Sequence, residues 1–178
     1  MDLNSHAIVA YVAGPIARFA ERLRHELQPG STDRPHITIL GPRAVGDLAA
    51  AIEFARHQAS QFEPFQVQIA GVKSFDGTQV VFLSVERGAQ ELVAMHGVLN
   101  TGALEAPEAY QYVPHITVGK HLPVEGFAES VELVRRRWDE LGAVEPLRIE
   151  TVAFVQERPD GEWADLAEFG LGRVPAVS

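Results

Sequence analysis

The tetrapeptide Pro-His-Ile-Thr occurs twice in this chain, at residues 35–38 and 114–117, and an aliphatic residue follows each copy. Ile, Thr and Val favour strands, and Pro and Gly bound both runs, so each copy is predicted to form a short strand. Because side chains alternate between the faces of a strand, the His and the Thr of each copy share one face. The aliphatic residues share the other face, which can be buried.

The order of predicted elements around these two motif strands indicates a diverged internal duplication. Each motif strand is preceded by a strand and a helix and followed by a helix and a strand, and one more strand ends the series. His36 and His115 are 79 positions apart (115 − 36), close to half of the 178 residues. Apart from the motif strands, the predicted strands are 6–13, 65–75, 79–86, 146–156 and 162–169, and the predicted helices are 16–27, 48–59, 92–99 and 127–141.

This duplication predicts a single bilobal α+β domain over residues 1–178. The pseudo-repeat lobes would cover roughly 1–76 and 77–172, and residues 173–178 would form a loose tail. A chain of 178 residues is long enough for two small lobes that share a core. A pseudo-twofold axis between the lobes would bring the two motif strands face to face across a cleft.

The side chains on these strands suit acid–base chemistry on a phosphodiester. The candidate catalytic residues are His36, Thr38, His115 and Thr117. Histidine titrates near neutrality, so one imidazole can accept a proton while the other donates one. Threonine hydroxyls can donate hydrogen bonds to non-bridging phosphoryl oxygens as charge develops on them. Two histidines without a third ligand make a poor zinc site, so no metal is expected.

Composition limits the partners of such a site. The net charge of −9 disfavours a long nucleic acid bound over an extended surface, because such proteins neutralise many phosphates. The absence of cysteine excludes disulfides, thiolate metal sites and thiol nucleophiles. The sequence has no apolar run near the roughly 20 residues that a bilayer requires and no export signal. We therefore expect a cytoplasmic monomer that binds no membrane.

The paired motifs, their spacing and the repeated order resemble the 2H phosphoesterase superfamily, within it the 2′-5′ RNA ligase-like and 2′,3′-cyclic phosphodiesterase branch. The Pro-Phe-x-Val stretch at 64–67, Tyr112, Lys120 and the turn at 160–161 extend the resemblance over most of the chain. The resemblance implies two antiparallel sheets facing a central cleft, with helices packed on the outside. It also implies no cofactor, and a substrate with a 2′,3′-cyclic phosphate on an RNA end or a small nucleotide.

Three further residues are candidates for substrate binding. Tyr112 could stack on a base or pack at the entrance of its strand, and Phe82 could form a base platform or belong to the core. Lys120 could bind phosphate, although strand alternation places it opposite His115 unless the strand bends. Two other functions remain open, namely reversible 2′-5′ RNA ligation and a non-catalytic module that binds nucleotides or RNA ends.

Overall fold

The structure is a computed structural model that describes residues 5–75 and 77–172. The helices are α1 (Gly14–Leu27), α2 (Leu48–Ala59), α3 (Ala89–Leu99) and α4 (Phe127–Leu141), with a short 3-10 turn η1 (Gly102–Leu104). The strands are β1 (Ser5–Tyr11), β2 (His36–Ala44), β3 (Phe65–Val67), β4 (Ile69–Phe75), β5 (Val80–Val85), β6 (His115–Gly119), β7 (Leu147–Ile149), β8 (Thr151–Glu157) and β9 (Trp163–Gly170). The predicted tail, 173–178, and Asp76 of the predicted turn lie outside the described residues.

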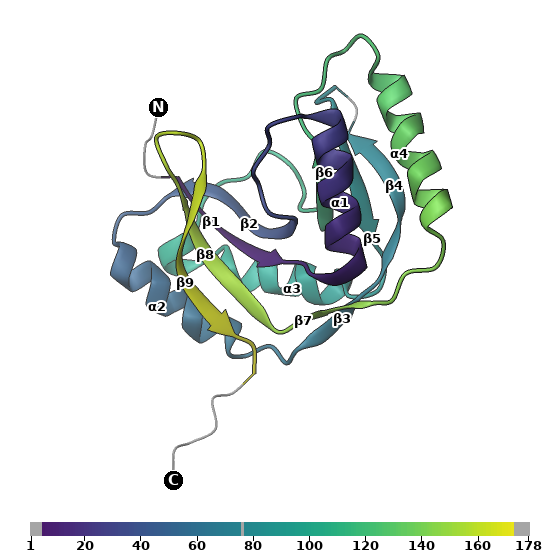
Figure 1. Cartoon of the computed structure of the whole chain (residues 1–178). Coiled ribbons are helices and arrows are strands. Elements are labelled where there is room, and N and C mark those ends of the chain that lie inside the picture. The colour runs from purple at the N-terminus through teal and green to yellow at the C-terminus, as the bar shows by residue number, and fades with distance from the viewer. Residues whose placement is uncertain (1–4, 76, 173–178) are drawn as a thin grey trace.

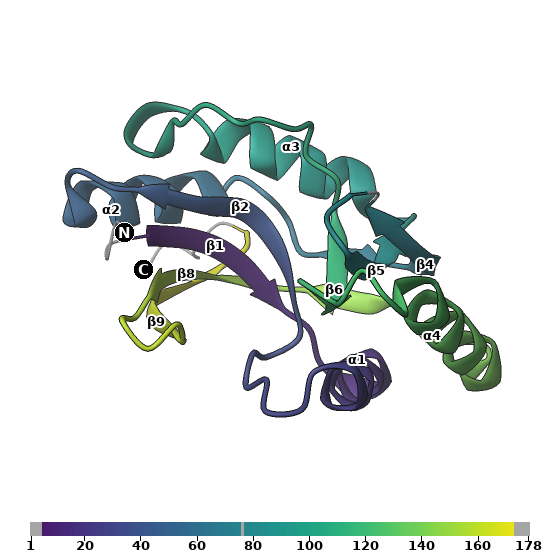
Figure 2. The same cartoon turned by 90° about the horizontal axis from the view of Figure 1, so that it is seen from above.

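Seven of the strands form an antiparallel sheet in the order β4-β5-β6-β2-β1-β8-β9. Within the described residues, its two motif strands, β2 and β6, pair at a single position, where Ile37 faces Ile116. This junction divides the sheet into one half made of β4, β5 and β6 and another made of β2, β1, β8 and β9 (Figure 2). The predicted α+β class and antiparallel pairing are confirmed.

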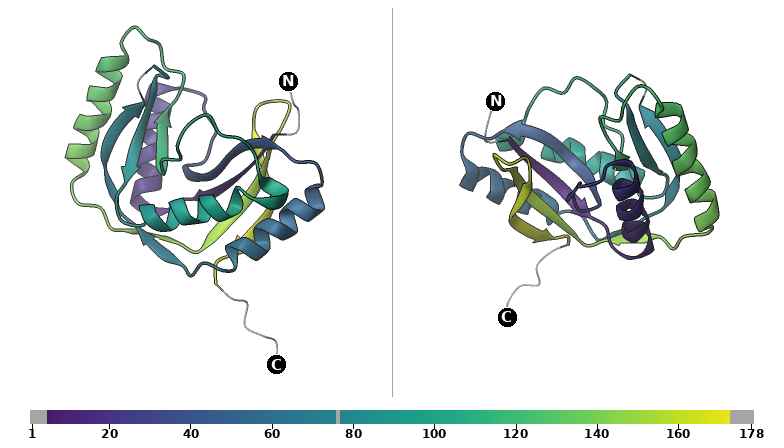
Figure 3. Two further views of the ribbon diagram at one scale, coloured as in Figure 1. Left: turned by 180° about the vertical axis from the view of Figure 1, so that it is seen from behind. Right: turned by 45° about the horizontal axis from the view of Figure 1, so that its top comes forward.

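The helices pack on the outside of the two sheet halves, but a helix does not always cover the half that contains the strand before it. Helix α1 lies on β6 and α4 on β4, whereas α3 lies on β2 and α2 on β8 and β9 (Figures 1 and 3). Strand β1 therefore joins one half of the sheet, while the helix that follows it covers the other half. The elements of 1–76 and 77–172 are thus interleaved, and the division into two pseudo-repeat lobes stays a prediction.

Two segments predicted as single strands are each broken at one residue. The segment 65–75 divides at Gln68 into β3 and β4, and the segment 146–156 divides at Glu150 into β7 and β8. The Gln68 backbone leaves the ladder to bond Arg87 and Glu86, at 3.0 and 2.9 Å. Strands β3 and β7 then pair with each other in a separate two-stranded sheet, along the side where the two halves meet (Figure 1).

Helix α1 illustrates how the apolar pattern positions these elements. Pro15 occupies its first turn, where the missing amide hydrogen costs nothing. Ile16, Phe19 and Leu23 recur at helical spacing and are at most 4% exposed, so this stripe seals α1 against the sheet. In the part of the chain that the structure describes, no helix has the length and apolar character needed to cross a membrane.

Replacing Ile116 by Ala should lower the free energy of unfolding by about 2–5 kcal/mol. Its side chain is fully buried opposite Ile37, so truncation leaves a cavity where the halves of the sheet meet. Urea unfolding measures the change, and Val124→Ala is the control, because Val124 is 77% exposed and its truncation should cost less than about 0.5 kcal/mol. Equal midpoints for the two variants would contradict tight packing at the junction.

Candidate active site

The junction between β2 and β6 brings the four motif side chains to one face of the sheet. Since Ile37 faces Ile116 in an antiparallel pair, His36 lies across from Thr117 and Thr38 lies across from His115. Both isoleucines are fully buried, whereas the four motif side chains are half-buried on the opposite face. The predicted alternation is therefore present on both strands.

The two histidines are oriented by equivalent backbone contacts. Nδ1 of His36 lies 2.6 Å from the carbonyl oxygen of Arg34, and Nδ1 of His115 lies 2.6 Å from the carbonyl oxygen of Val113. A carbonyl oxygen can only accept a hydrogen bond, so each Nδ1 carries the proton that it donates. In the neutral ring, Nε2 is then the basic nitrogen of both histidines.

Two adjoining cavities open on this face and meet at Thr38, which lines both. The first cavity, of about 320 Å³, is lined by His36 and Thr117 together with charged side chains that include Arg24, Asp33 and Lys120. The second cavity, of about 590 Å³, is lined by His115 and by aromatic rings that include Phe75, Tyr110 and Tyr112. The site therefore has a charged side next to His36 and an aromatic side next to His115.

Side chains from outside the motifs satisfy the two carbonyls that the short junction leaves unpaired in the ladder. The Tyr112 hydroxyl donates to the carbonyl oxygen of Thr38 at 2.8 Å. The Arg24 guanidinium donates to the carbonyl oxygen of Thr117 at 2.6 Å and to that of Asp33 at 2.9 Å. Buried backbone carbonyls need such partners, so these contacts stabilise the strands where they diverge.

Burial lowers the pKa of both catalytic candidates below the ordinary value for histidine. For His36, the hydrogen bond to the Arg34 carbonyl raises the pKa and opposes burial, and the nearby cations lower it further. The contributing charges are Arg24 and Lys120, which lower this pKa, and Asp33, which raises it. For His115, only the hydrogen bond to its backbone acceptor opposes the effect of burial. Both rings therefore favour the neutral form.

The three predicted substrate-binding residues occupy different environments. Tyr112 is half-buried, and its ring stacks on His96 with the centroids 4.2 Å apart. Phe82 is 3% exposed and packs against Phe75 and His115, so its ring supports the imidazole and Phe75 is the ring that lines the cavity. Their roles in binding stay predictions.

Lys120 lies in the first cavity, so strand alternation, which would place it opposite His115, does not extend to this residue. Strand β6 ends at Gly119, and beyond that residue the chain no longer alternates between the faces of a sheet. The ammonium group of Lys120 lies 3.3 Å from the Asp33 carboxylate, beside His36. The position of Lys120 therefore allows a direct contact with a bound phosphate.

Arg24 was not among the site residues predicted from the sequence, although its position in the helix is unusual for a cation. It falls four residues after Ala20 and eight after Ile16, on the buried stripe of α1, where a cation is unusual. Arg34 also lines the first cavity, with its guanidinium carbon 3.7 Å from the centre of the Tyr11 ring. Within the described residues, no group of three or more His, Asp or Glu side chains is placed to hold a metal ion.

Comparisons with known proteins give one family. A model of the 2′-5′ RNA ligase superfamily matches residues 12–161. A provisionally named phosphoesterase of Halalkalibacterium halodurans is 19% identical over 172 residues, covering 95% of this chain and 98% of the relative. A similarly named protein of Bacillus licheniformis is 22% identical over 170 residues, covering 94% and 98%.

Solved structures of Escherichia coli LigT share the fold. The complex of LigT with phosphate has a TM-score of 0.65 at 14% identity, covering 96% of this chain and 98% of that chain. The complex of LigT with 3′-AMP has a TM-score of 0.63 at 13% identity, covering 97% of this chain and 100% of that chain. These structures show a shared fold, and the match of the family model to residues 12–161 confirms the family that the motifs predicted.

Replacing Lys120 by Met should raise the pKa of His36 and leave the pKa of His115 unchanged. Lys120 lowers the first of these pKa values, and its removal also leaves the Asp33 carboxylate unpaired, which raises the same pKa further. No lysine contributes to the pKa of His115. Proton NMR titration of the imidazole rings measures both values, and a shift of equal size in both rings would contradict this electrostatic assignment.

Proposed function

The chain belongs to the 2′-5′ RNA ligase superfamily, and we propose that it is a metal-independent phosphodiesterase that hydrolyses 2′,3′-cyclic phosphates. The substrates would be RNA ends or small nucleotides. The observation that carries the proposal is the junction between β2 and β6, which places two His-x-Thr pairs on one face between two cavities. That arrangement supplies a proton acceptor and a proton donor on opposite sides of one phosphoryl group.

Hydrolysis in this site needs one neutral and one protonated imidazole. A water molecule attacks phosphorus, and Nε2 of the neutral ring takes the proton that the water loses. As the bond from phosphorus to the 2′ or 3′ oxygen breaks, the protonated ring gives its proton to that leaving oxygen. The hydroxyls of Thr38 and Thr117 donate to the non-bridging oxygens, whose negative charge increases in the transition state. The ring that begins neutral ends protonated, so one proton transfer resets the pair.

Local cations support binding of an anionic substrate to a chain whose net charge is −9. Arg24 and Lys120 line the first cavity together with Arg34. Arg24 already donates to two backbone carbonyls, so it attracts the phosphate through its positive charge. Lys120 is half-exposed and can turn from Asp33 toward a phosphoryl oxygen. The phosphate is therefore drawn to the His36 side of the site.

The second cavity suits the nucleoside. Its volume of about 590 Å³ falls within the range of small-molecule sites, about 300–1,000 Å³. Phe75, Tyr110 and Tyr112 line it, and aromatic faces accept any base. LigT, which shares the fold, has been solved with 3′-AMP, with NADP⁺ and with ATP. A nucleotide with its base in the second cavity would place its phosphate at Thr38.

His36→Ala and His115→Ala should each lower kcat by about two to four powers of ten, because each removes one proton-transfer group. The measurement is hydrolysis of a 2′,3′-cyclic nucleotide with EDTA present, which should leave the wild-type rate unchanged. His57→Ala, on the solvent face of α2, is the control and should keep full activity. Loss of the wild-type rate in EDTA would contradict metal-independent hydrolysis.

The pH profile of kcat/KM should be a bell whose maximum lies below about pH 6.5, the ordinary pKa of histidine. The rate rises with pH as the base loses its proton and falls as the acid loses its proton. Because burial lowers the pKa of both rings in the free enzyme, both limbs lie on the acid side of that value. Steady-state rates on a cyclic mononucleotide across the acid and neutral range test this. A maximum well above pH 7 would contradict it.

A further inference from the structure

The segment between η1 and β6 contributes more to the second cavity than its lack of helix or strand suggests. We call residues 105–114 the recognition loop. Five residues of this loop line the second cavity, namely Glu108, Tyr110, Gln111, Tyr112 and Val113. The carbonyl of Val113 also accepts the hydrogen bond that orients His115. The loop therefore forms a wall of the cavity, and its end next to β6 holds one catalytic candidate in place.

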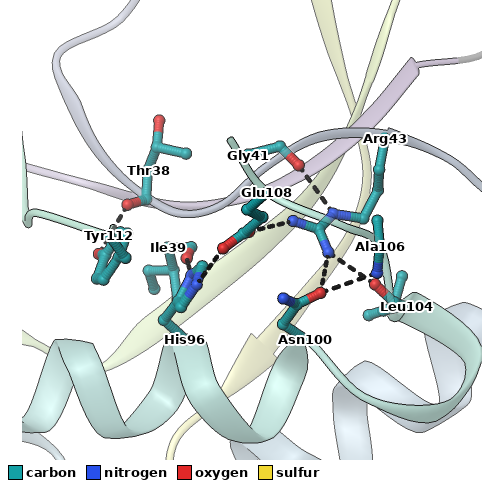
Figure 4. A network of polar contacts seen from close by, with 10 residues as sticks. All are labelled: Thr38, Ile39, Gly41, Arg43, His96, Asn100, Leu104, Ala106, Glu108 and Tyr112. Carbon is teal, nitrogen blue, oxygen red and sulfur yellow. Dashed lines mark hydrogen bonds and ion pairs between the residues drawn. The ribbon is translucent and has the colours of Figure 1, made fainter. Parts of the chain in front are cut away.

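One carboxylate ties the recognition loop to two elements of the scaffold (Figure 4). Oε1 of Glu108 accepts from Nη2 of Arg43 at 2.8 Å, and Oε2 lies 2.8 Å from Nε2 of His96. Arg43 belongs to β2 and His96 to α3, and their side chains are only 5% and 12% exposed. Both carboxylate oxygens of Glu108 are thus paired with side chains that are nearly buried.

The partners of Glu108 are themselves held rigidly. The Arg43 guanidinium also donates to the carbonyls of Gly41 and Leu104, at 3.0 and 2.7 Å, and to the side chain of Asn100 at 2.6 Å. Nδ1 of His96 lies 2.7 Å from the carbonyl oxygen of Ile39 in β2. Ion pairs with this degree of burial and hydrogen bonding fix one geometry. Glu108 is therefore a rigid anchor in a segment without a backbone ladder.

The anchor connects to the motif strand through ring stacking. The His96 imidazole lies parallel to the Tyr112 ring, with a centroid separation of 4.2 Å and an angle of 2° between the planes. The Tyr112 hydroxyl donates to the carbonyl oxygen of Thr38, as Figure 4 shows. Tyr112 is thus engaged on one face and at its hydroxyl. Tyr110, by contrast, is 84% exposed at the same cavity.

We propose that Glu108 is a positioning residue that latches the recognition loop to Arg43 and His96, and that the latched loop presents Tyr110 to the nucleoside of the substrate. The proposal rests on the proposed function, which places the nucleoside in the second cavity. Glu108 has no contact with the reacting atoms in this scheme. Its carboxylate acts through the backbone of the loop, and Tyr110 supplies the aromatic face that covers the base.

The test compares Glu108→Ala with Glu108→Gln. The amide of Gln can still accept from Arg43 through its oxygen, and its nitrogen can face Nε2 of His96 as a hydrogen-bond partner. We expect Glu108→Ala to raise KM for a 2′,3′-cyclic nucleotide about tenfold with kcat within about threefold, and Glu108→Gln to restore most of the affinity. Amide hydrogen exchange over 105–113 should quicken in Glu108→Ala alone.

Two further variants separate the latch from general stability. Tyr110→Ala, which removes an exposed ring, should raise KM to a similar extent without changing hydrogen exchange in the loop. Glu132→Ala removes another ion-paired carboxylate, 69% exposed on α4, and should change neither measurement. If Glu108→Ala proves too unstable to purify, Tyr110→Ala still tests the proposal, because an unchanged KM in that variant would overturn it.

Several results would overturn the proposal. Unchanged loop exchange in Glu108→Ala would remove the latch, and a loss confined to kcat would show an effect on chemistry instead of on nucleoside binding. A well-folded Glu108→Gln as weak as Glu108→Ala would exclude positioning by hydrogen bonds. If the wild type hydrolyses no cyclic phosphate, the proposed function fails, and calorimetric binding of 3′-AMP decides the latch. Tenfold weaker binding of 3′-AMP by Glu108→Ala than by the wild type would support it. Equal binding by the two proteins, or no binding by the wild type, would overturn it.

Discussion

The contact between Ile37 and Ile116 is the constraint on which the site depends. A longer ladder would hold β2 and β6 about 4.8 Å apart along their length, and neighbouring side chains would fill the space between them. The strands instead separate after one pair, which leaves cavities on both sides of Thr38. Burial of both isoleucines also fixes the register, because a slip of one residue would turn the imidazoles into the core. Burial of the isoleucine face of each strand thus determines where the His and Thr side chains point.

Separation of the strands has a cost that the surrounding structure offsets unequally. Each diverging strand leaves a threonine carbonyl without a ladder partner, and two unrelated side chains replace it. A phenol from the recognition loop bonds Thr38, and a buried guanidinium from α1 bonds Thr117. The guanidinium carries a charge and the phenol does not. The same structural need therefore introduces an electrostatic difference between the two sides of the site.

Local pattern was enough to predict the parts of this fold that depend on neighbouring residues. Alternation on the motif strands and the apolar stripe of α1 both follow from spacing, and the structure contains them. Which half of the sheet each helix covers could not be predicted from residue spacing, because spacing describes the apolar face of a helix and not the strands that it contacts. The breaks at Gln68 and Glu150 depend on hydrogen bonds from distant segments. Lys120 reached the cavity because β6 ends one residue earlier, and strand ends are the least predictable part of a sequence pattern.

The two motifs supply two similar histidines, but the proposed acid–base chemistry needs them in different protonation states. In a perfectly symmetric site, both rings would bind a proton equally well and proton transfer would have no preferred direction. The two rings differ here through their neighbours. His36 responds to Arg24, Asp33 and Lys120, whereas His115 packs against Phe75 and Phe82. In the proposed mechanism, the motifs supply the groups that exchange protons, and the residues that differ around them set the direction in which the protons move.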